Sequence, residues 1–272
     1  MLNNSRKLLC FILTMIMATG IFVFLLSVVV RTTICNQAYV ENFFCTSKIT
    51  AYCDEVYNQR ISLLAENSDI PLQVFEANDN HEGYNNTVIQ RFFEGSDTTI
   101  FTRDKINTYE KLIKEYLDGN EFSYDNDAVH YTAVKAAEIY ADSYGLKNVD
   151  AFKHLIDDFI ACFDRVSSIA LALVLYSSIL LSVLYTNKKK VLKYFSSAFV
   201  SAGAGMVLSA LLALVFGLGK GAQISPDIYQ NAIFNSISVM FFIVMVSGGL
   251  VIALAEASLL RHYRMTKKTR NG

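Results

Sequence analysis

Four long apolar segments, none containing a charged residue, dominate the pattern of hydrophobic and polar positions along this 272-residue chain. They are Leu8–Val30, Val166–Tyr185, Phe195–Leu218 and Ala232–Ala255, and each contains 20 to 24 residues. At about 1.5 Å of rise per residue, helices of this length measure roughly 30–36 Å, enough to cross a hydrocarbon core of about 30 Å. The pattern therefore predicts an all-α, polytopic membrane protein with four transmembrane helices.

The first apolar segment follows Arg6 and Lys7, an arrangement that signal peptides share. However, Leu8–Val30 is longer than the roughly 7–15 apolar residues of a signal peptide, and no cleavage site of small residues follows it. We therefore expect this segment to remain in the membrane as an anchor.

Apolar residues at helical spacing characterise the segment Arg31–Asp164, which separates the first two apolar runs and contains no strictly alternating stretch. The first helix is expected to continue outward to about Glu66. Asp69 is expected to cap a helix that begins at Pro71, and the polar stretch Asn78–Asn86 is expected to form a loop. Two further helices are expected at Thr102–Leu117, ended by Gly119, and at Asp127–Tyr144, ended by Gly145.

The end of this segment contains a regular apolar seam that leads into the second apolar run. Its residues step by 3, 4, 3, 4 and 3 positions: Val149, Phe152, Ile156, Phe159, Phe163 and Val166. Because no Gly or Pro interrupts it, we expect one continuous helix from about Val149 to Tyr185, with Asn148 at its start. It should pack antiparallel to the outward extension of the first helix, near Cys45, Ile49, Tyr52 and Val56.

The charges divide the chain into two opposite parts. Arg31–Asp164 holds 23 Asp and Glu against 11 Lys and Arg, a net charge of −12, whereas all other residues hold 2 against 13, a net of +11. We expect four regions: a cytoplasmic N-terminus with the first span (1–30), an acidic helical extracytoplasmic domain (31–164), spans two to four (165–260) and a basic tail (261–272). The lysines at 188–193 and the basic residues at 261–270 predict that both termini are cytoplasmic.

The third span contains small residues at every fourth position. They are Ser197, Ser201, Gly205, Ser209, Ala213 and Gly217, with Ala198, Ala202 and Ala210 beside them. Small residues on one face of a membrane helix allow another helix to approach closely. We interpret this face as a helix contact, either within the bundle or between copies of the chain.

Five cysteines offer one geometrically acceptable disulfide. Cys35 lies 5 residues after Val30, and Cys162 lies 4 residues before Val166, so a bridge could join the two helices at the membrane surface. The alternative is that all the thiols are free. The chain contains no C-x-x-C, which argues against zinc and thioredoxin-like sites.

No motif in the chain predicts catalysis, a cofactor or nucleic-acid binding. Asn78–Gly83 resembles the start of a calcium loop, but Ile89 occupies the position of its bidentate carboxylate. We therefore expect a solvated acidic loop here; the alternative is a weak cation site using Asp79, Glu82, Asp125 or Asp127. Gly217–Gly221 lacks the first Gly and the Ser/Thr of a phosphate-binding loop. We expect a non-enzyme without cofactors or metals.

We therefore expect a membrane component for binding, sensing or assembly, whose partners are the lipid bilayer and another membrane or extracytoplasmic protein. Four spans with a large loop after the first resemble, in topology only, the permease-like subunits of ABC systems. That resemblance implies an alternative, a transport-related subunit that couples the outer domain to a cytoplasmic ATPase. Frequent Asn, Lys, Ile and Tyr without any Trp favour a bacterial origin.

Overall fold

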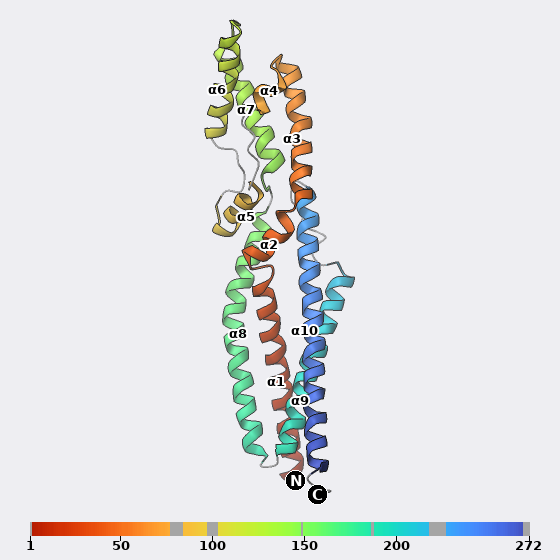
Figure 1. Ribbon diagram of the computed structural model, residues 1–272. Coiled ribbons are helices and arrows are strands. Elements are labelled where there is room, and N and C mark those ends of the chain that lie inside the picture. The colour runs from red at the N-terminus through yellow and green to blue at the C-terminus, as the bar shows by residue number, and fades with distance from the viewer. Residues whose placement is uncertain are drawn as a thin grey trace. The chain divides into compact units, whose positions relative to one another are not determined.

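The computed structural model describes residues 2–76, 84–96, 103–147, 149–185, 188–217 and 227–268. Its regular elements are helical, as the sequence predicts. In chain order they are α1 (Leu2–Thr32), α2 (Gln37–Phe44), α3 (Ser47–Ser68), α4 (Leu72–Glu76), α5 (Tyr84–Glu94), α6 (Arg103–Gly119), α7 (Asn126–Tyr144), α8 (Asp150–Leu184), α9 (Lys188–Val215) and α10 (Asp227–Lys268) (Figure 1).

Four of these helices are long and apolar enough to cross a membrane, which confirms the four predicted spans. The apolar parts are Ser5–Thr32 in α1, Ile156–Leu184 in α8, Lys189–Val215 in α9 and Asp227–Arg261 in α10. The shortest has 27 residues, or about 40 Å of helix.

The chain folds as two compact units. The first, called the bundle unit here, contains Met1–Asn36, Leu155–Gly219 and Ser236–Gly272. The second, called the acidic unit, contains Gln37–His154 and Lys220–Asn235, which together hold 21 Asp and Glu against 11 Lys and Arg. The acidic unit thus includes a second segment, Lys220–Asn235, that lies outside the expected extracytoplasmic domain of residues 31–164.

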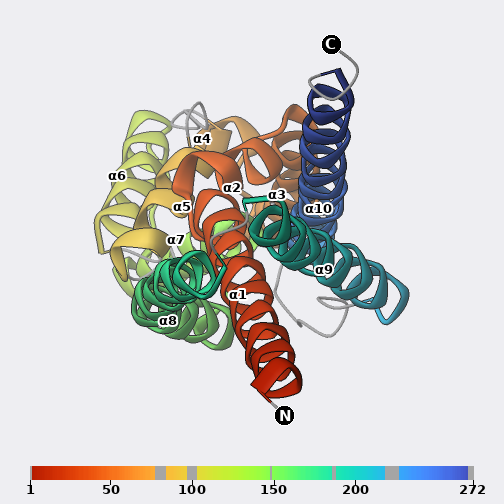
Figure 2. The ribbon, with the colours of Figure 1, turned by 90° about the horizontal axis from the view of Figure 1, so that it is seen from below.

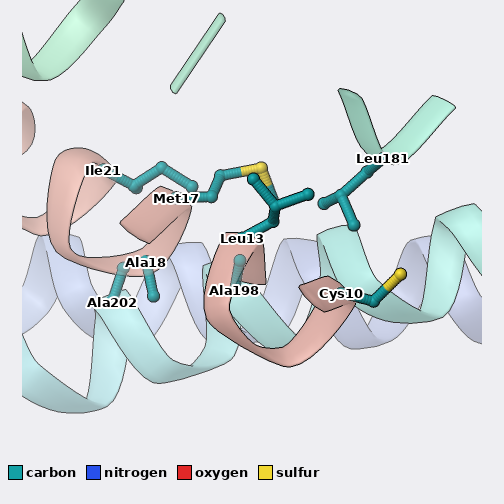
Figure 3. Packing of buried hydrophobic residues seen from close by; sticks show 8 residues of the cluster. All are labelled: Cys10, Leu13, Met17, Ala18, Ile21, Leu181, Ala198 and Ala202. Atoms are coloured by element: carbon teal, nitrogen blue, oxygen red, sulfur yellow. The ribbon is translucent and has the colours of Figure 1, made fainter. Parts of the chain in front are cut away.

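In the bundle unit, α1 lies between α8 and α9, and α10 packs against α9 (Figures 1 and 2). α1 contributes five residues to a buried cluster whose other members come from α8 and α9: Cys10, Leu13, Met17, Ala18, Ile21, Leu181, Ala198 and Ala202 (Figure 3). An exposed ion pair of 2.9 Å between Arg31 and Asp164 also joins α1 to α8.

In the acidic unit, α7 packs against both α3 and α6. α3 buries every fourth residue, Ile49, Cys53, Tyr57, Ile61 and Ala65, so one stripe of the helix faces the core. The Tyr57 ring meets the rings of Tyr140 and Tyr144 of α7 at centroid distances of 5.8 and 5.6 Å. The Tyr57 hydroxyl also lies 2.9 Å from that of Tyr109 of α6.

The predicted continuity of the second span is confirmed, because α8 is a single helix of 35 residues from Asp150 to Leu184. Its least exposed positions extend the predicted seam into the apolar run. Ile156, Ala170, Ser177 and Leu181 are buried, and Phe159, Phe163, Val166 and Val174 are half-buried.

The predicted extension of the first helix to Glu66 is wrong. α1 ends at Thr32, where a turn follows. A second break separates α2 from α3, which begins at Ser47. At the first break, the Thr33 hydroxyl donates to the Val29 carbonyl at 2.6 Å. At the second, Thr46 caps α3 by accepting a hydrogen bond from the Ile49 N–H. Neither break contains Gly or Pro, and the Thr46 cap favours a new helix start at Ser47.

Three smaller predictions also need correction. Asp69 is the left-handed C-cap of α3 and does not start the next helix, which begins at Leu72. α7 is capped by Asp125, two residues before the predicted Asp127, although Gly145 ends it as expected. The stretch 84–86 belongs to helix α5 and not to a loop, while Asn78–Gly83, Thr102 and Asn148 lie outside the described residues.

Candidate functional site

The small-residue face predicted on α9 is only partly buried within the chain. Ala213 is buried, Gly205 and Ser209 are half-buried, and Ser197 and Ser201 are exposed. Gly217 lies two residues past the end of α9, at a φ of 62°. A contact of Ser197 and Ser201 with another copy of the chain stays a prediction.

The buried residues of α9 are mostly those beside this face. They include Ala198, Ala202, Met206 and Ala210, together with Gly203 and with Ala213 of the face itself. A Cβ atom on Gly203 would come within 2.6 Å of the Gly248 carbonyl oxygen of α10, and one on Gly248 would come within 2.6 Å of the Gly203 carbonyl oxygen. The two backbones therefore touch, as close crossings between membrane helices require.

A second close approach joins α1 to α8. A Cβ atom on Gly20 would lie 2.8 Å from the Val174 side chain and 3.0 Å from the Ala170 carbonyl oxygen. Gly205 is more tolerant, because its Cβ would lie 3.3 Å from the Phe22 ring. Sequence reasoning missed Gly20 and Gly203, since each is a single glycine outside the four-residue repeat.

All five cysteines are free thiols, and no bridge joins Cys35 to Cys162 in the structure. Burial raises the pKa of Cys35 to about 11, against a smaller opposing effect of Arg31. Burial likewise raises the pKa values of Cys45 and Cys53 to about 11. Because the thiolate is the nucleophile, these three residues are poorly suited to covalent chemistry near neutral pH.

The acidic unit contains a cleft of about 390 Å³ between the end of α3 and the connection from α6 to α7. Its walls include Asp69 and Ile70 after α3, Phe122 and Asp125 from the connection, and Val129 of α7. Phe122 is 54% exposed, so an aromatic ring stands beside a group of carboxylates. Apolar surface next to fixed charge is a common composition of binding sites.

Of two unusual backbone positions, Asp69 lines this cleft and Glu121 directly precedes the lining residue Phe122. Asp69 and Glu121 are the only described residues other than glycine with positive φ, at 55° and 58°. Asp69 follows the end of α3, and Glu121 follows the end of α6. In each case the backbone N–H of the next residue donates to a carbonyl of the last turn: Ile70 to Ala65 at 3.2 Å, and Phe122 to Leu117 at 3.0 Å. In this type of helix end glycine is preferred, so the two side chains are held here at a conformational cost.

Negative charge dominates the rim of the cleft. Asp69, Glu121 and Asp125 are all exposed. A hydrogen bond with Asp118 raises the pKa of the Tyr124 phenol, which leaves this side chain neutral. The described ion pairs of the unit, such as Lys114 with Glu110 at 2.7 Å, do not include any of the three rim carboxylates.

A buried chain of hydrogen bonds connects the start of α10 to the rest of the acidic unit. The Cys53 thiol donates to the Tyr229 hydroxyl at 3.9 Å, and Tyr229 donates to the Asn85 side-chain oxygen at 3.1 Å. The Asn85 amide then donates to the Thr50 hydroxyl at 2.9 Å. The Tyr229 ring also stacks on Phe44 at a centroid distance of 5.6 Å. These contacts fix the first turn of α10 within the acidic unit.

Among the described residues, no group of three or more His, Cys, Asp or Glu is arranged to hold a metal ion. Asp79 and Glu82 of the weak cation site, and most of Gly217–Gly221, lie outside those residues. No protein family model matches the chain, and no curated protein or solved structure is significantly similar to it.

Proposed function

We propose that the protein is a non-enzymatic membrane subunit for binding or sensing, whose acidic unit lies on the extracytoplasmic side and binds a partner with a basic surface. The observation that carries this proposal is the course of α8 and α10. Both helices begin in the acidic unit and continue without a break into the bundle unit. Because an α-helix is stiff, a displacement of its first turns moves the rest of it.

The cleft between α3 and the α6–α7 connection supports the binding part of the proposal. Its exposed Phe122 provides an aromatic contact, and aromatic anchors often dominate binding energy. Asp69 and Asp125 line the cleft, and the exposed Glu121 precedes its residue Phe122 in the chain; this negative charge attracts a basic partner and orients it.

The distribution of basic residues supports the proposed orientation. Lys189, Lys190 and Lys193 lie at the start of α9, and Arg6 and Lys7 lie near the start of α1. These parts of the bundle unit lie at the same end, together with the last turns of α10 (Figure 1). Lys and Arg accumulate on the cytoplasmic side of membrane proteins, so the acidic unit is assigned to the opposite side.

Binding can be tested with fluorescent decalysine and the full-length chain in lipid nanodiscs. The double variant Glu121→Gln/Asp125→Asn should weaken binding about three- to tenfold, as expected for the loss of two exposed charge contacts. Asn also caps helices well, so α7 should be retained. The matched control Glu55→Gln/Glu115→Gln removes two exposed carboxylates of the same unit away from the cleft. Equal weakening by both variants would exclude the cleft.

Transmission along α8 can be tested with a single tryptophan, because the chain contains none. A Val183→Trp variant places the reporter at an exposed position near the end of α8, and decalysine should shift its emission. Adding Ser168→Pro, which breaks the helix, should abolish the shift, whereas Ser168→Ala should keep it. A shift that persists in the proline variant would contradict transmission through α8.

The alternative, a permease-like subunit, differs in its partner. Purification of the full-length chain in mild detergent, followed by identification of bound proteins, separates the two. A stoichiometric cytoplasmic ATPase would favour the alternative, and an extracytoplasmic protein would favour the binding subunit.

A further inference from the structure

The bundle unit contains a groove at the end where α8 stops and α9 starts. Its volume is about 710 Å³, within the range of about 300–1,000 Å³ that is usual for ligand sites. α9 and α10 form its walls, and Tyr185, directly after the end of α8, lies at one side. The residues that line the walls include Phe195, Ser196, Phe199, Val251 and Leu254. All of these residues belong to the bundle unit.

Three serines line this groove, but each of their hydroxyls already donates to a backbone carbonyl. The Ser182 hydroxyl donates to the Ser178 carbonyl at 2.9 Å, and Ser196 donates to the Ala255 carbonyl at 3.2 Å. The Ser258 hydroxyl donates to the Leu254 carbonyl at 2.8 Å. Since backbone carbonyls already accept these protons, the groove is suited to a hydrocarbon chain and not to a polar ligand.

Positive charge is concentrated at the Tyr185 side of the groove. The Arg6 guanidinium lies 4.5 Å from the centroid of the Tyr185 ring, and the Lys190 ammonium lies 5.6 Å from it. Two cations thus approach one aromatic ring that also lines the groove. Among the described residues, neither Arg6 nor Lys190 forms an ion pair with a carboxylate. An anion beside the Tyr185 ring is therefore attracted by both cations.

We propose that this groove binds an anionic phospholipid, with one acyl chain against Phe195, Phe199 and Leu254 and the phosphate beside Arg6 and Lys190. The charge favours this occupant over a neutral lipid or an apolar helix, since both of these would leave the two cations without a counter-charge. Basic pockets between membrane helices are known as sites for anionic head groups. This site is independent of the partner proposed for the acidic unit.

The head-group contact is tested by native mass spectrometry of the full-length chain in detergent, with phosphatidylglycerol and phosphatidylcholine of equal acyl length. The wild-type chain should retain phosphatidylglycerol with a preference of about tenfold or more, and Arg6→Gln/Lys190→Gln should lose it. The control Lys7→Gln/Lys189→Gln removes the same charge from neighbouring positions and should keep the preference. If the two double variants lose it equally, only diffuse attraction remains and the site is wrong.

The acyl-chain contact needs its own variants. Leu254→Trp should fill the groove and reduce retention of the lipid several-fold, whereas Leu212→Trp, at another exposed leucine on α9 outside the groove, should have no effect. Both variants should elute from a sizing column as the wild-type protein does. Glycerol phosphate, added as a head group without chains, should not compete. Competition by it, or normal retention by Leu254→Trp, would overturn the proposal.

Discussion

At the scale of single residues, Glu121 in the α6–α7 connection has a backbone conformation that lowers stability. Its φ of 58° lies in the left-handed region, where a residue with a Cβ atom costs roughly 1–2 kcal/mol. Asp69, which lines the cleft beside this connection, has the same backbone conformation, but Asp tolerates it better than Glu does. The proposed binding role of the acidic unit would account for a carboxylate at this strained position.

We predict that Glu121→Gly stabilises the protein and weakens binding of decalysine. Relief of the left-handed strain should exceed the extra entropy that Gly loses on folding, for a gain of about 0.5–1 kcal/mol. The midpoint of thermal unfolding in detergent should therefore rise. Glu121→Gln, which keeps the Cβ atom, should weaken binding without raising the midpoint. A lower midpoint for Glu121→Gly would show that the strain argument is wrong.

A second residue-scale prediction concerns Tyr229. Tyr229→Phe keeps the ring that stacks on Phe44 but removes the hydroxyl that donates to Asn85. A buried acceptor that loses its partner costs about 1–3 kcal/mol, so the midpoint of thermal unfolding should fall. Tyr131→Phe is the control, because Tyr131 is exposed, and it should leave the midpoint unchanged. Equal midpoints for the two variants would mean that the hydrogen-bond chain adds no stability.

At the scale of helices, adjacent glycines of α10 provide a sharp test of the crossing with α9. Gly248 touches the Gly203 backbone, whereas a Cβ atom on Gly249 would meet nothing within 4 Å. We predict that Gly248→Leu separates α9 from α10 and lowers the unfolding midpoint in detergent, with a loss of about 1–3 kcal/mol by analogy with overpacked cores. Gly249→Leu should be nearly neutral. Similar losses at the two positions would contradict the crossing.

The helices also show what the sequence could and could not predict. The four membrane-length helices and the unbroken α8 followed from hydrophobic length and spacing, which are properties of one segment alone. The predicted small-residue face of α9 stays a prediction, and spacing within α9 does not reveal that Gly203, beside that face, meets Gly248. The breaks after α1 and before α3 were missed because no Gly or Pro marks them, and Thr46, the N-cap of α3, is a weak signal on its own.

The same limit applies to the candidate site. Gly119 predicts the end of α6, but nothing in the local sequence predicts that Glu121 adopts positive φ or that Asp69 lines a cleft with Phe122. Asp69 and Phe122 are far apart in the chain. Only the packing of α3 and α6 on α7 brings them to one cleft.

At the scale of the whole molecule, the separation of charge between the two units is the strongest constraint on orientation. The acidic unit has a net charge of −10, from 21 acidic and 11 basic residues, although the chain as a whole is close to neutral. An arrangement with the acidic unit in the cytoplasm would move the lysines at the start of α9 to the outside, against the usual bias.

We therefore predict that both termini and the α8–α9 connection are cytoplasmic and that the acidic unit is extracytoplasmic. The test uses a chain without native cysteines, new single cysteines at Asn120 and Asn187, and a thiol reagent that does not cross membranes. In intact cells the cysteine at Asn120, an exposed position just after α6, should react, and the one at Asn187 should react only after the membrane is permeabilised. The inverse result would reverse the orientation. The basic end of the bundle unit would then face outward, and a partner of the acidic unit would have to be cytoplasmic.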